Sequence, residues 1–306
     1  MASLPQFAYF RLSEKRSREP VRYEPDYPLV LFVLFSRWSL GIAVVAGLMQ
    51  IANHLPRLVT LSMMLALILI FTATLFSIFH LSDRIRFMAM MKNLRSRVSQ
   101  EVIFAGVFMG LVAIDCLILL VFDPDDRIRI LLAGAVIGFG LLALAATGWA
   151  YKFHAHPYWN TNILSVYYLI SGLFWGASTI FWLVTLFFPF SHLGTSRSMP
   201  MVLAGFLLVL FLVGLAYVRY VRKDLSQRFR VNLKDKNGVL VILYALFVFV
   251  LPAVSLVASA VATQLLFYSS TFILLSLLVG AFVERVVFFS IESPHYMFRV
   301  LSDTSM

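Results

Sequence analysis

Eight apolar stretches, each about the length of a membrane-crossing helix, limit the fold of this chain more than any other feature. A helix spans a bilayer core with about 20 predominantly apolar residues, and it satisfies its backbone hydrogen bonds internally. The stretches are Leu29–Ile51, Leu58–Phe79, Val102–Phe122, Ile128–Ala150, Ile163–Phe188, Met201–Val221, Val239–Ala262 and Leu265–Ser290. We therefore predict an all-α fold, a polytopic integral membrane protein with eight transmembrane helices in a bundle. Pro252, in the middle of the seventh stretch, predicts a kink there.

The composition excludes a water-soluble globular protein. Of the 306 residues, 61% are apolar and only 13% are charged, whereas soluble domains carry about 25% charged residues. The single cysteine, Cys116, lies inside an apolar stretch. One thiol provides neither a disulfide framework nor the ligand set of a zinc ion or an iron–sulfur cluster. We therefore predict no metal site in this chain, and any such metal must belong to a partner.

Basic residues gather on one side of the predicted membrane, which we call the basic side. An even number of spans puts both termini there, together with the loops after the second and sixth spans. Its basic residues include Arg11, Lys15, Arg16, Arg18, Arg22, Arg84, Arg86, Lys92, Arg95, Arg97, Arg219, Arg222, Lys223, Arg228, Arg230, Lys234 and Lys236. The opposite side has only Arg57, Arg127, Arg129 and Arg197. The positive-inside rule then predicts that the basic side is cytoplasmic.

This topology accounts for the net charge of +10, so we predict no nucleic-acid binding. It divides the chain into an N-terminal cytoplasmic tail over residues 1–28, a transmembrane domain over 29–290 and a C-terminal tail over 291–306. A basic face also suits the docking of an acidic soluble subunit. Glycines four residues apart, at Gly106–Gly110, Gly134–Gly138 and Gly172–Gly176, predict close packing of the third, fourth and fifth helices.

Ionisable residues inside the spans are few. Each costs about 2.5–3.5 kcal/mol at the centre of a helix, so each is a candidate for function. The candidates are Arg37 and Asp115 within the first and third spans, Glu284 and Arg285 in the last quarter of the eighth, His80, which closes the second span, and Glu101, which opens the third. All but Asp115 fall in the half of the membrane nearest the basic side. Snorkelling towards headgroups is the competing interpretation for those near span ends.

In the segment from His80 to Glu101, an imidazole and a carboxylate flank a basic, Met-rich connector. Such a pair accepts protons near neutral pH, which suits the oxidation of a quinol at the edge of an apolar pocket. An interfacial helix with a capping histidine fits the spacing equally well.

The residues of this segment resemble a known family. His80-Leu-Ser-Asp-Arg-Ile-Arg86, Asn93-Leu-Arg95 and Ser99-Gln-Glu101 are similar to the loop between the second and third helices of the membrane anchor subunits of dimethyl sulfoxide reductase complexes. That family typically shows His-Leu-Gly-x-Pro-x-Arg followed by Leu-Ser-x-Glu. Here Ser82 and Arg84 replace its glycine and proline.

Two further segments carry the same resemblance. Pro157-Tyr-Trp159 resembles the family's proline–tryptophan segment before the fifth helix, and Arg285-Val-Val-Phe288-Phe289 resembles its closing Gly-Arg-x-x-Phe-Tyr, with Glu284 in place of the glycine. The resemblance implies an anchor of a molybdoenzyme complex for anaerobic respiration in a bacterial or archaeal cytoplasmic (cell inner) membrane. It implies a ferredoxin-like iron–sulfur subunit and a molybdopterin catalytic subunit as partners, with menaquinol as the bound substrate.

The resemblance places the quinol site at His80, Arg86 and Glu101. His80 and Glu101 would take the protons, and Arg86 would orient a quinone carbonyl or the loop. Arg37, Glu284 and Arg285 would support the site, with the arginines balancing buried carboxylates. Some family members place this loop on the periplasmic side, but we follow the charge count, which places it in the cytoplasm.

Three alternatives remain open on the sequence. One haem near the basic side would use His80 with His154 or His156, as in a cytochrome b, although histidines next to Tyr151, Tyr158 and Trp159 also suit an aromatic belt. A proton-coupled secondary transporter would use Asp115, Glu101 and Glu284 as a relay. A purely structural anchor would bind no quinol, and substitutions of His80 and Glu101 would then affect assembly and not turnover.

Overall fold

The computed structural model describes residues 27–80, 94–122, 124–152, 161–187, 198–225, 236–262 and 265–290. Within these ranges there is no strand. The helices are α2 (Tyr27–Ile51), α3 (Pro56–His80), α5 (Arg97–Val121), α6 (Asp126–Ala150), α7 (Asn162–Phe187), α8 (Ser198–Leu225), α9 (Lys236–Ala245), α10 (Leu251–Val261) and α11 (Leu266–Ser290). Eight spans are long and apolar enough to cross a membrane, with α9 and α10 forming one of them. The predicted all-α fold with eight transmembrane helices is confirmed.

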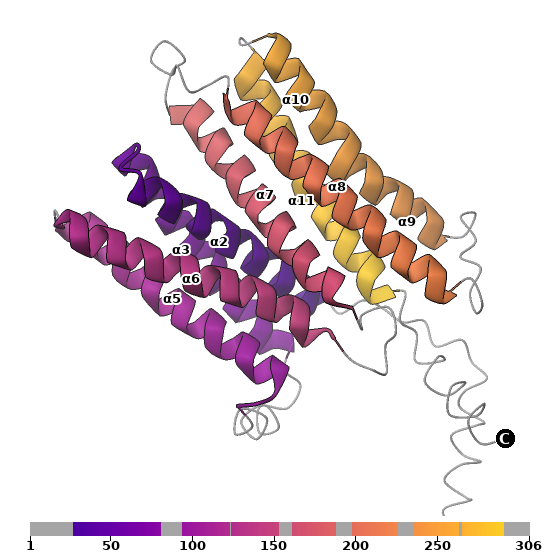
Figure 1. The fold of residues 1–306 in the computed structure, drawn as a ribbon, viewed down its shortest axis with the longest axis horizontal. Helices are drawn as coiled ribbons and strands as arrows, with labels where there is room; N and C mark the ends of the chain where they lie inside the picture. Colours follow the sequence, from indigo (N-terminus) through magenta and orange to yellow (C-terminus); the bar gives the residue numbers. More distant parts are fainter. Residues whose placement is uncertain are drawn as a thin grey trace, which may run out of the picture.

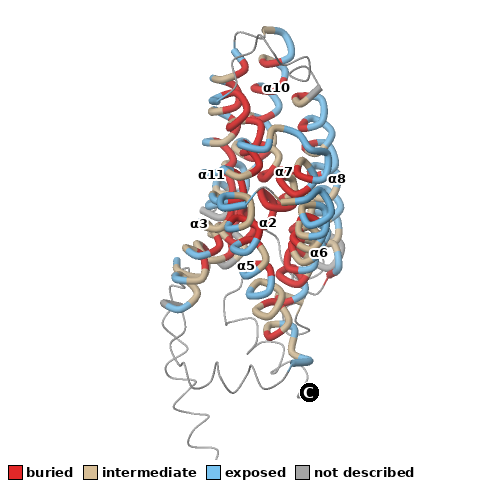
Figure 2. The backbone as a smooth tube through the Cα atoms, turned by 90° about the vertical axis from the view of Figure 1, so that its left-hand side faces the viewer, coloured by how far each residue is buried: buried red, intermediate tan, exposed pale blue. Residues whose placement is uncertain are grey.

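Helix α7 lies between two groups of helices (Figure 1). On one side it contacts α2 and α6, which pack with α3 and α5, and on the other it contacts α8 and α11. Within its most apolar stretch 67% of α7 is buried, and 72% of α2, against 17% of α8. Figure 2 shows the same contrast, with buried segments in the interior and exposed ones along α8. The two central helices can therefore carry polar residues away from lipid, and α2 carries the buried Arg37.

The outer surface of the bundle is apolar, as a lipid-facing surface must be. Large side chains that are more than 70% exposed include Leu131, Met201 and Val261. In water such a surface would be an aggregation hazard, whereas in hydrocarbon it incurs no cost.

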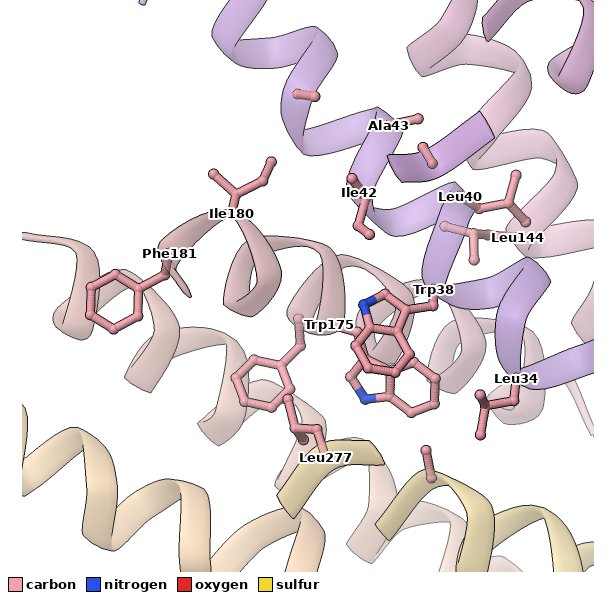
Figure 3. Close-up of a cluster of buried hydrophobic side chains, with 14 of the residues drawn as sticks. Leu34, Trp38, Leu40, Ile42, Ala43, Leu144, Trp175, Ile180, Phe181 and Leu277 are labelled. Atoms are coloured by element: carbon pink, nitrogen blue, oxygen red, sulfur yellow. The ribbon is translucent and has the colours of Figure 1, made fainter. Parts of the chain in front are cut away.

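Helices α2 and α7 approach each other closely because both carry glycine at the crossing. A Cβ on Gly41 would lie 1.8 Å from the Gly172 carbonyl oxygen, and one on Gly176 would lie 2.2 Å from the Gly41 carbonyl carbon. One helical turn away, Trp38 Nε1 donates to Thr179 Oγ1 over 2.7 Å. Figure 3 shows Trp38 beside Trp175 within this contact, their rings 5.9 Å apart and edge to face. Backbone contact replaces the hydrophobic driving force that lipid does not supply.

The prediction from glycine spacing is wrong for two of its three pairs. Gly172 lies at the close crossing with Gly176. By contrast, a Cβ would meet nothing within 4 Å at Gly106, Gly110, Gly134 and Gly138. Spacing places two glycines on one face of a helix, but it does not say whether that face meets another helix.

The seventh span is distorted just before Pro252. A π-helical segment, Leu246–Val250, joins α9 to α10. Proline has no N–H for the carbonyl group four residues earlier and its ring clashes with that carbonyl, so the backbone widens by a π turn. The π-helical segment begins two residues after Tyr244, which points from α9 towards α7, as described below.

Candidate functional site

Arg37 of α2 forms a two-pronged ion pair with Glu284 of α11. Its Nη1 donates to Glu284 Oε1 over 3.3 Å and its Nη2 to Glu284 Oε2 over 3.0 Å. The Arg37 side chain is fully buried, and Glu284 is 9% exposed. A guanidinium group matches a carboxylate in this planar arrangement, which gives the contact direction as well as strength. The pair joins the first and last spans of the chain.

Arg285, the next residue on α11, shares the same carboxylate. Its Nη2 donates to Glu284 Oε1, and its Nη1 donates to the Tyr168 hydroxyl oxygen of α7. Arg285 is 1% exposed and Tyr168 is fully buried. We call Arg37, Glu284 and Arg285 the arginine cluster.

Helix α7 provides the surface on which the arginine cluster lies. Tyr168, Ser171 and Trp175 are three and four residues apart and so share one helical face. The Ser171 hydroxyl accepts from Arg37 Nη1 over 3.1 Å. The guanidinium carbon of Arg37 stands 3.8 Å from the centre of the Trp175 ring, and that of Arg285 stands 4.6 Å from the centre of Tyr168. Desolvated cation–π contacts of this kind stabilise the cations by about 2 kcal/mol.

A pair of tyrosines extends the network to the seventh span. The hydroxyl groups of Tyr167 and Tyr244 are 2.6 Å apart and share a hydrogen bond. Both phenols lie within electrostatic range of Arg37 and Arg285. Hydrogen bonds and ring contacts thus connect α2, α7, α9 and α11 through polar groups in the bundle interior.

Glu101 of α5 lies nearer the helix ends than the arginine cluster does. The sequence predicted that Glu101 opens the third span, but α5 begins at Arg97, so Glu101 lies one turn inside the helix. Its side chain is 8% exposed, and its Oε1 has no hydrogen-bond partner. Thr147 of α6 lies beside it. Along the axes, Glu101 is about 6 Å from the start of α5, and Arg37 about 15 Å from the start of α2.

Tyr151 and Tyr168 stand between Glu101 and Arg285. Tyr151 follows α6 and stacks on Tyr168 with ring centres 6.1 Å apart. Both phenols lie within electrostatic range of Glu101 and of Arg285. Burial raises the pKa of the Tyr151 hydroxyl well above its ordinary value, so this group stays neutral. A buried carboxylate with one unpartnered oxygen atom and a buried cation therefore border the same two phenols.

A comparison with protein families shows the family to which this chain belongs. The family model of the DMSO reductase anchor subunit (DmsC) matches residues 23–291. The chain belongs to this family. It is thus a multi-pass membrane anchor subunit of DMSO reductase, and the family implies association with the catalytic and iron–sulfur subunits of that enzyme. A search of curated proteins found no match.

Two of the three predicted quinol-binding residues of the anchor subunit cannot be placed as side chains. The backbone of His80 closes α3, but its side chain and all of Arg86 lie outside the described residues. His154 and His156 also lie outside, as do Pro157 and Trp159. The haem alternative therefore rests entirely on side chains that the structure does not describe. Glu101 is the one member of the predicted trio whose surroundings are known.

Asp115 lies far from the other carboxylates of the anchor subunit. It is fourteen residues beyond Glu101 on α5, about 21 Å along the axis. Its Oδ1 accepts from Gln50 Nε2 of α2 over 2.9 Å, and Gln50 also donates to the Arg129 carbonyl oxygen over 3.3 Å. The transporter alternative needs Asp115, Glu101 and Glu284 in one relay, and no described contact connects Asp115 to the other two.

Sequence reasoning missed the tyrosines of the site. Tyrosine near a span end is usually assigned to the aromatic belt at the membrane surface, and Tyr151 was interpreted in that way. Tyr168, however, is six residues into α7, about 9 Å from its start. A phenol at that depth needs a polar partner. This depth is the signal that would have placed Tyr167 and Tyr168 in the site.

Proposed function

We propose that the anchor subunit binds menaquinol beside Glu101 and passes its electrons to the iron–sulfur subunit, for delivery to a molybdopterin catalytic subunit during anaerobic respiration. The observation that carries this proposal is the position of Glu101, a buried carboxylate with an unpaired oxygen atom next to Tyr151 and Tyr168. Unpaired buried carboxylates are costly, and they persist where they serve chemistry.

Oxidation of one quinol breaks two O–H bonds and releases two protons and two electrons. Glu101 accepts one proton through the oxygen atom that has no partner, and the His80 imidazole accepts the other. The electrons leave to the ferredoxin-like iron–sulfur subunit, which docks on the basic side of the membrane. Arg86 orients the quinol or its loop.

The arginine cluster supports this chemistry from deeper in the bundle. Arg285 holds the Tyr168 hydroxyl, and Glu284 holds Arg285 and Arg37 in fixed positions. Tyr168 is therefore held in place by ring contacts with Arg285 and Tyr151, within electrostatic range of Glu101. Rigid support of this kind keeps a bound ring oriented for electron and proton transfer.

Replacing Glu101 with glutamine tests the proposal. General acid–base groups contribute about 10²–10⁴-fold, so we expect quinol-dependent reduction of dimethyl sulfoxide by the assembled complex to fall roughly a hundredfold. Reduction driven by a soluble viologen dye bypasses the membrane site and is expected to stay at the wild-type level. Steady-state rates with the two donors measure both effects, and His80→Ala is expected to behave in the same way.

Asp115→Asn provides the matched control, because it changes a buried carboxylate at the other end of α5. We expect this variant to keep full quinol-dependent turnover. Full turnover in both Glu101→Gln and His80→Ala would contradict the proposal. A parallel loss of viologen-dependent turnover and of membrane-bound reductase would instead favour a purely structural anchor.

We further propose that the basic side, with both termini, faces the cytoplasm. Cys116 is 4% exposed, so the natural thiol is shielded from labelling reagents. A cysteine introduced near the C-terminus, Ser305→Cys, is expected to react with a membrane-impermeant maleimide in inverted vesicles and not in intact cells. A cysteine at Asn53, after α2, is expected to show the opposite pattern, and the reverse result for both would overturn the orientation.

A further inference from the structure

The arginine cluster holds more positive than negative charge. Two guanidinium groups share one carboxylate, so with all three ionised the net charge is 2 − 1 = +1. Arg37 is fully buried and Arg285 is 1% exposed, so water does not offset the excess. A buried charge without a counter-ion is unfavourable, and inside a membrane it marks a functional site.

Both guanidinium groups also keep an unused donor. Arg37 Nε and Arg285 Nε are buried without a hydrogen-bond partner. Their surroundings supply hydroxyl groups from Tyr167, Ser171 and Tyr168 and ring faces from Trp175 and Tyr168, but, among the described residues, no second carboxylate in hydrogen-bond contact. Glu101, the other carboxylate near Tyr168, forms no described ion pair with either arginine. Free N–H donors and an excess positive charge together fit an anionic oxygen ligand.

We infer that the arginine cluster stabilises an anionic oxygen and, resting on the proposed function, that this oxygen is the deprotonated hydroxyl of the quinol. When a quinol O–H bond breaks and an O–H bond forms on Glu101, the negative charge moves from the carboxylate to the quinol oxygen. Before the transfer the negative charge lies on Glu101, outside the arginine cluster, whose own net charge is +1. Afterwards the charge lies on the quinol oxygen, and the cluster together with that oxygen has a net charge of zero. No electrons move in this step.

A matched pair of naphthoquinones tests the inference. 2-Hydroxy-1,4-naphthoquinone is ionised at neutral pH, whereas its 2-methoxy ether has the same ring and carries no charge. The Trp175 ring centre lies 3.8 Å from the guanidinium carbon of Arg37, so the part of the tryptophan quenching that is lost in a Trp175→Phe variant reports binding at the cluster. With the purified complex in phosphatidylcholine nanodiscs, we expect the ionised compound to bind about tenfold more tightly than the ether, as a charge-assisted contact should.

Three variants of the complex separate charge from shape. Arg37→Met brings the cluster to a net charge of zero, so we expect it to lose the preference for the ionised compound while still binding the ether. Arg37→Lys keeps the charge and is expected to keep most of the preference. Arg129→Met makes the same change at the opposite end of the bundle, where Arg129 bonds Asn53, and is expected to match the wild type.

The possible outcomes distinguish failure of the anion site from failure of the proposed quinol-binding function. Binding of both compounds with equal affinity would leave the quinol site intact and overturn the anion site. Absence of saturable binding by either compound would overturn both proposals. If phosphatidylglycerol added to the nanodiscs displaces the ionised compound in competition, the anionic oxygen is a lipid phosphate and the assignment to quinol is wrong.

Discussion

Replacing Glu284 with glutamine is expected to destabilise the anchor subunit far more than replacing Arg37 with methionine, although both changes break the same ion pair. The two variants differ in the charge that remains. Glu284→Gln leaves two buried guanidinium groups without a carboxylate, a charge of +2, whereas Arg37→Met leaves Glu284 paired with Arg285 and a charge of zero. Removing one partner of a buried ion pair costs about 3–5 kcal/mol because the other charge stays buried.

We therefore expect Glu284→Gln to lower the free energy of unfolding by about 3–5 kcal/mol. Arg37→Met loses the hydrogen bonds of Arg37 and its contact with Trp175, and we expect a loss of about 2 kcal/mol. Thermal unfolding of the complex, followed by tryptophan fluorescence, and the amount of anchor subunit retained in membranes measure the difference. Asp115→Asn is the control for a buried carboxylate elsewhere. Equal losses in the two cluster variants would show that the hydrogen bonds, and not the charge, stabilise this part of the bundle.

The spans were predictable because lipid imposes one strong rule on sequence. A stretch of about 20 apolar residues has few alternatives to a transmembrane helix, so the eight helices follow from hydropathy alone. Helix ends are less constrained, because polar residues continue a helix beyond the apolar stretch. Helix α5 begins at Arg97, five residues before the predicted start, and this extension places Glu101 within the helix.

Contacts between helices were harder to predict than the helices themselves. Gly106 and Gly134 belong to pairs with the same spacing as Gly172 and Gly176, yet they face open space. Gly140 and Gly148 stand apart from any such pair. A Cβ added to Gly140 would nevertheless lie within 3 Å of Val44, and one added to Gly148 within 3 Å of Ser165. Spacing within one helix carries no information about its neighbours, and tertiary structure alone decides which glycines matter.

The cost of burying charge made part of the site visible in the sequence. Arg37, Glu284 and Arg285 were candidates because charged residues are rare in apolar spans, and the structure brings them together from two helices. The phenols that complete the network are common in membrane proteins and carry no charge, so Tyr167 and Tyr244 gave no comparable signal. Their shared hydrogen bond depends on the register between α7 and α9, which no local pattern specifies.

Replacing Gly176 with alanine is expected to disrupt both the fold and the site, because α2 and α7 touch backbone to backbone there. The new Cβ would lie 2.2 Å from the Gly41 carbonyl carbon. Since the obstructing atoms belong to the backbone, no rotamer change relieves the clash, and the helices must separate. Overpacking typically costs 1–3 kcal/mol where side chains can adjust, so we expect a loss of about 3 kcal/mol or more. Gly134→Ala, which meets nothing within 4 Å, is the matched control and is expected to be neutral or slightly stabilising.

Separation of α2 from α7 would also disturb the arginine cluster, because Arg37 of α2 contacts side chains of α7. Arg37 is one turn from Gly41 on α2, and it depends on Ser171 and Trp175 of α7 for a hydrogen bond and a ring contact. We therefore expect Gly176→Ala to weaken binding of the ionised naphthoquinone as well as to lower the unfolding temperature of the complex, with Gly134→Ala changing neither. A variant that loses stability and keeps the full preference for the anion would show that the cluster is held by α11 and not by the close crossing of α2 and α7.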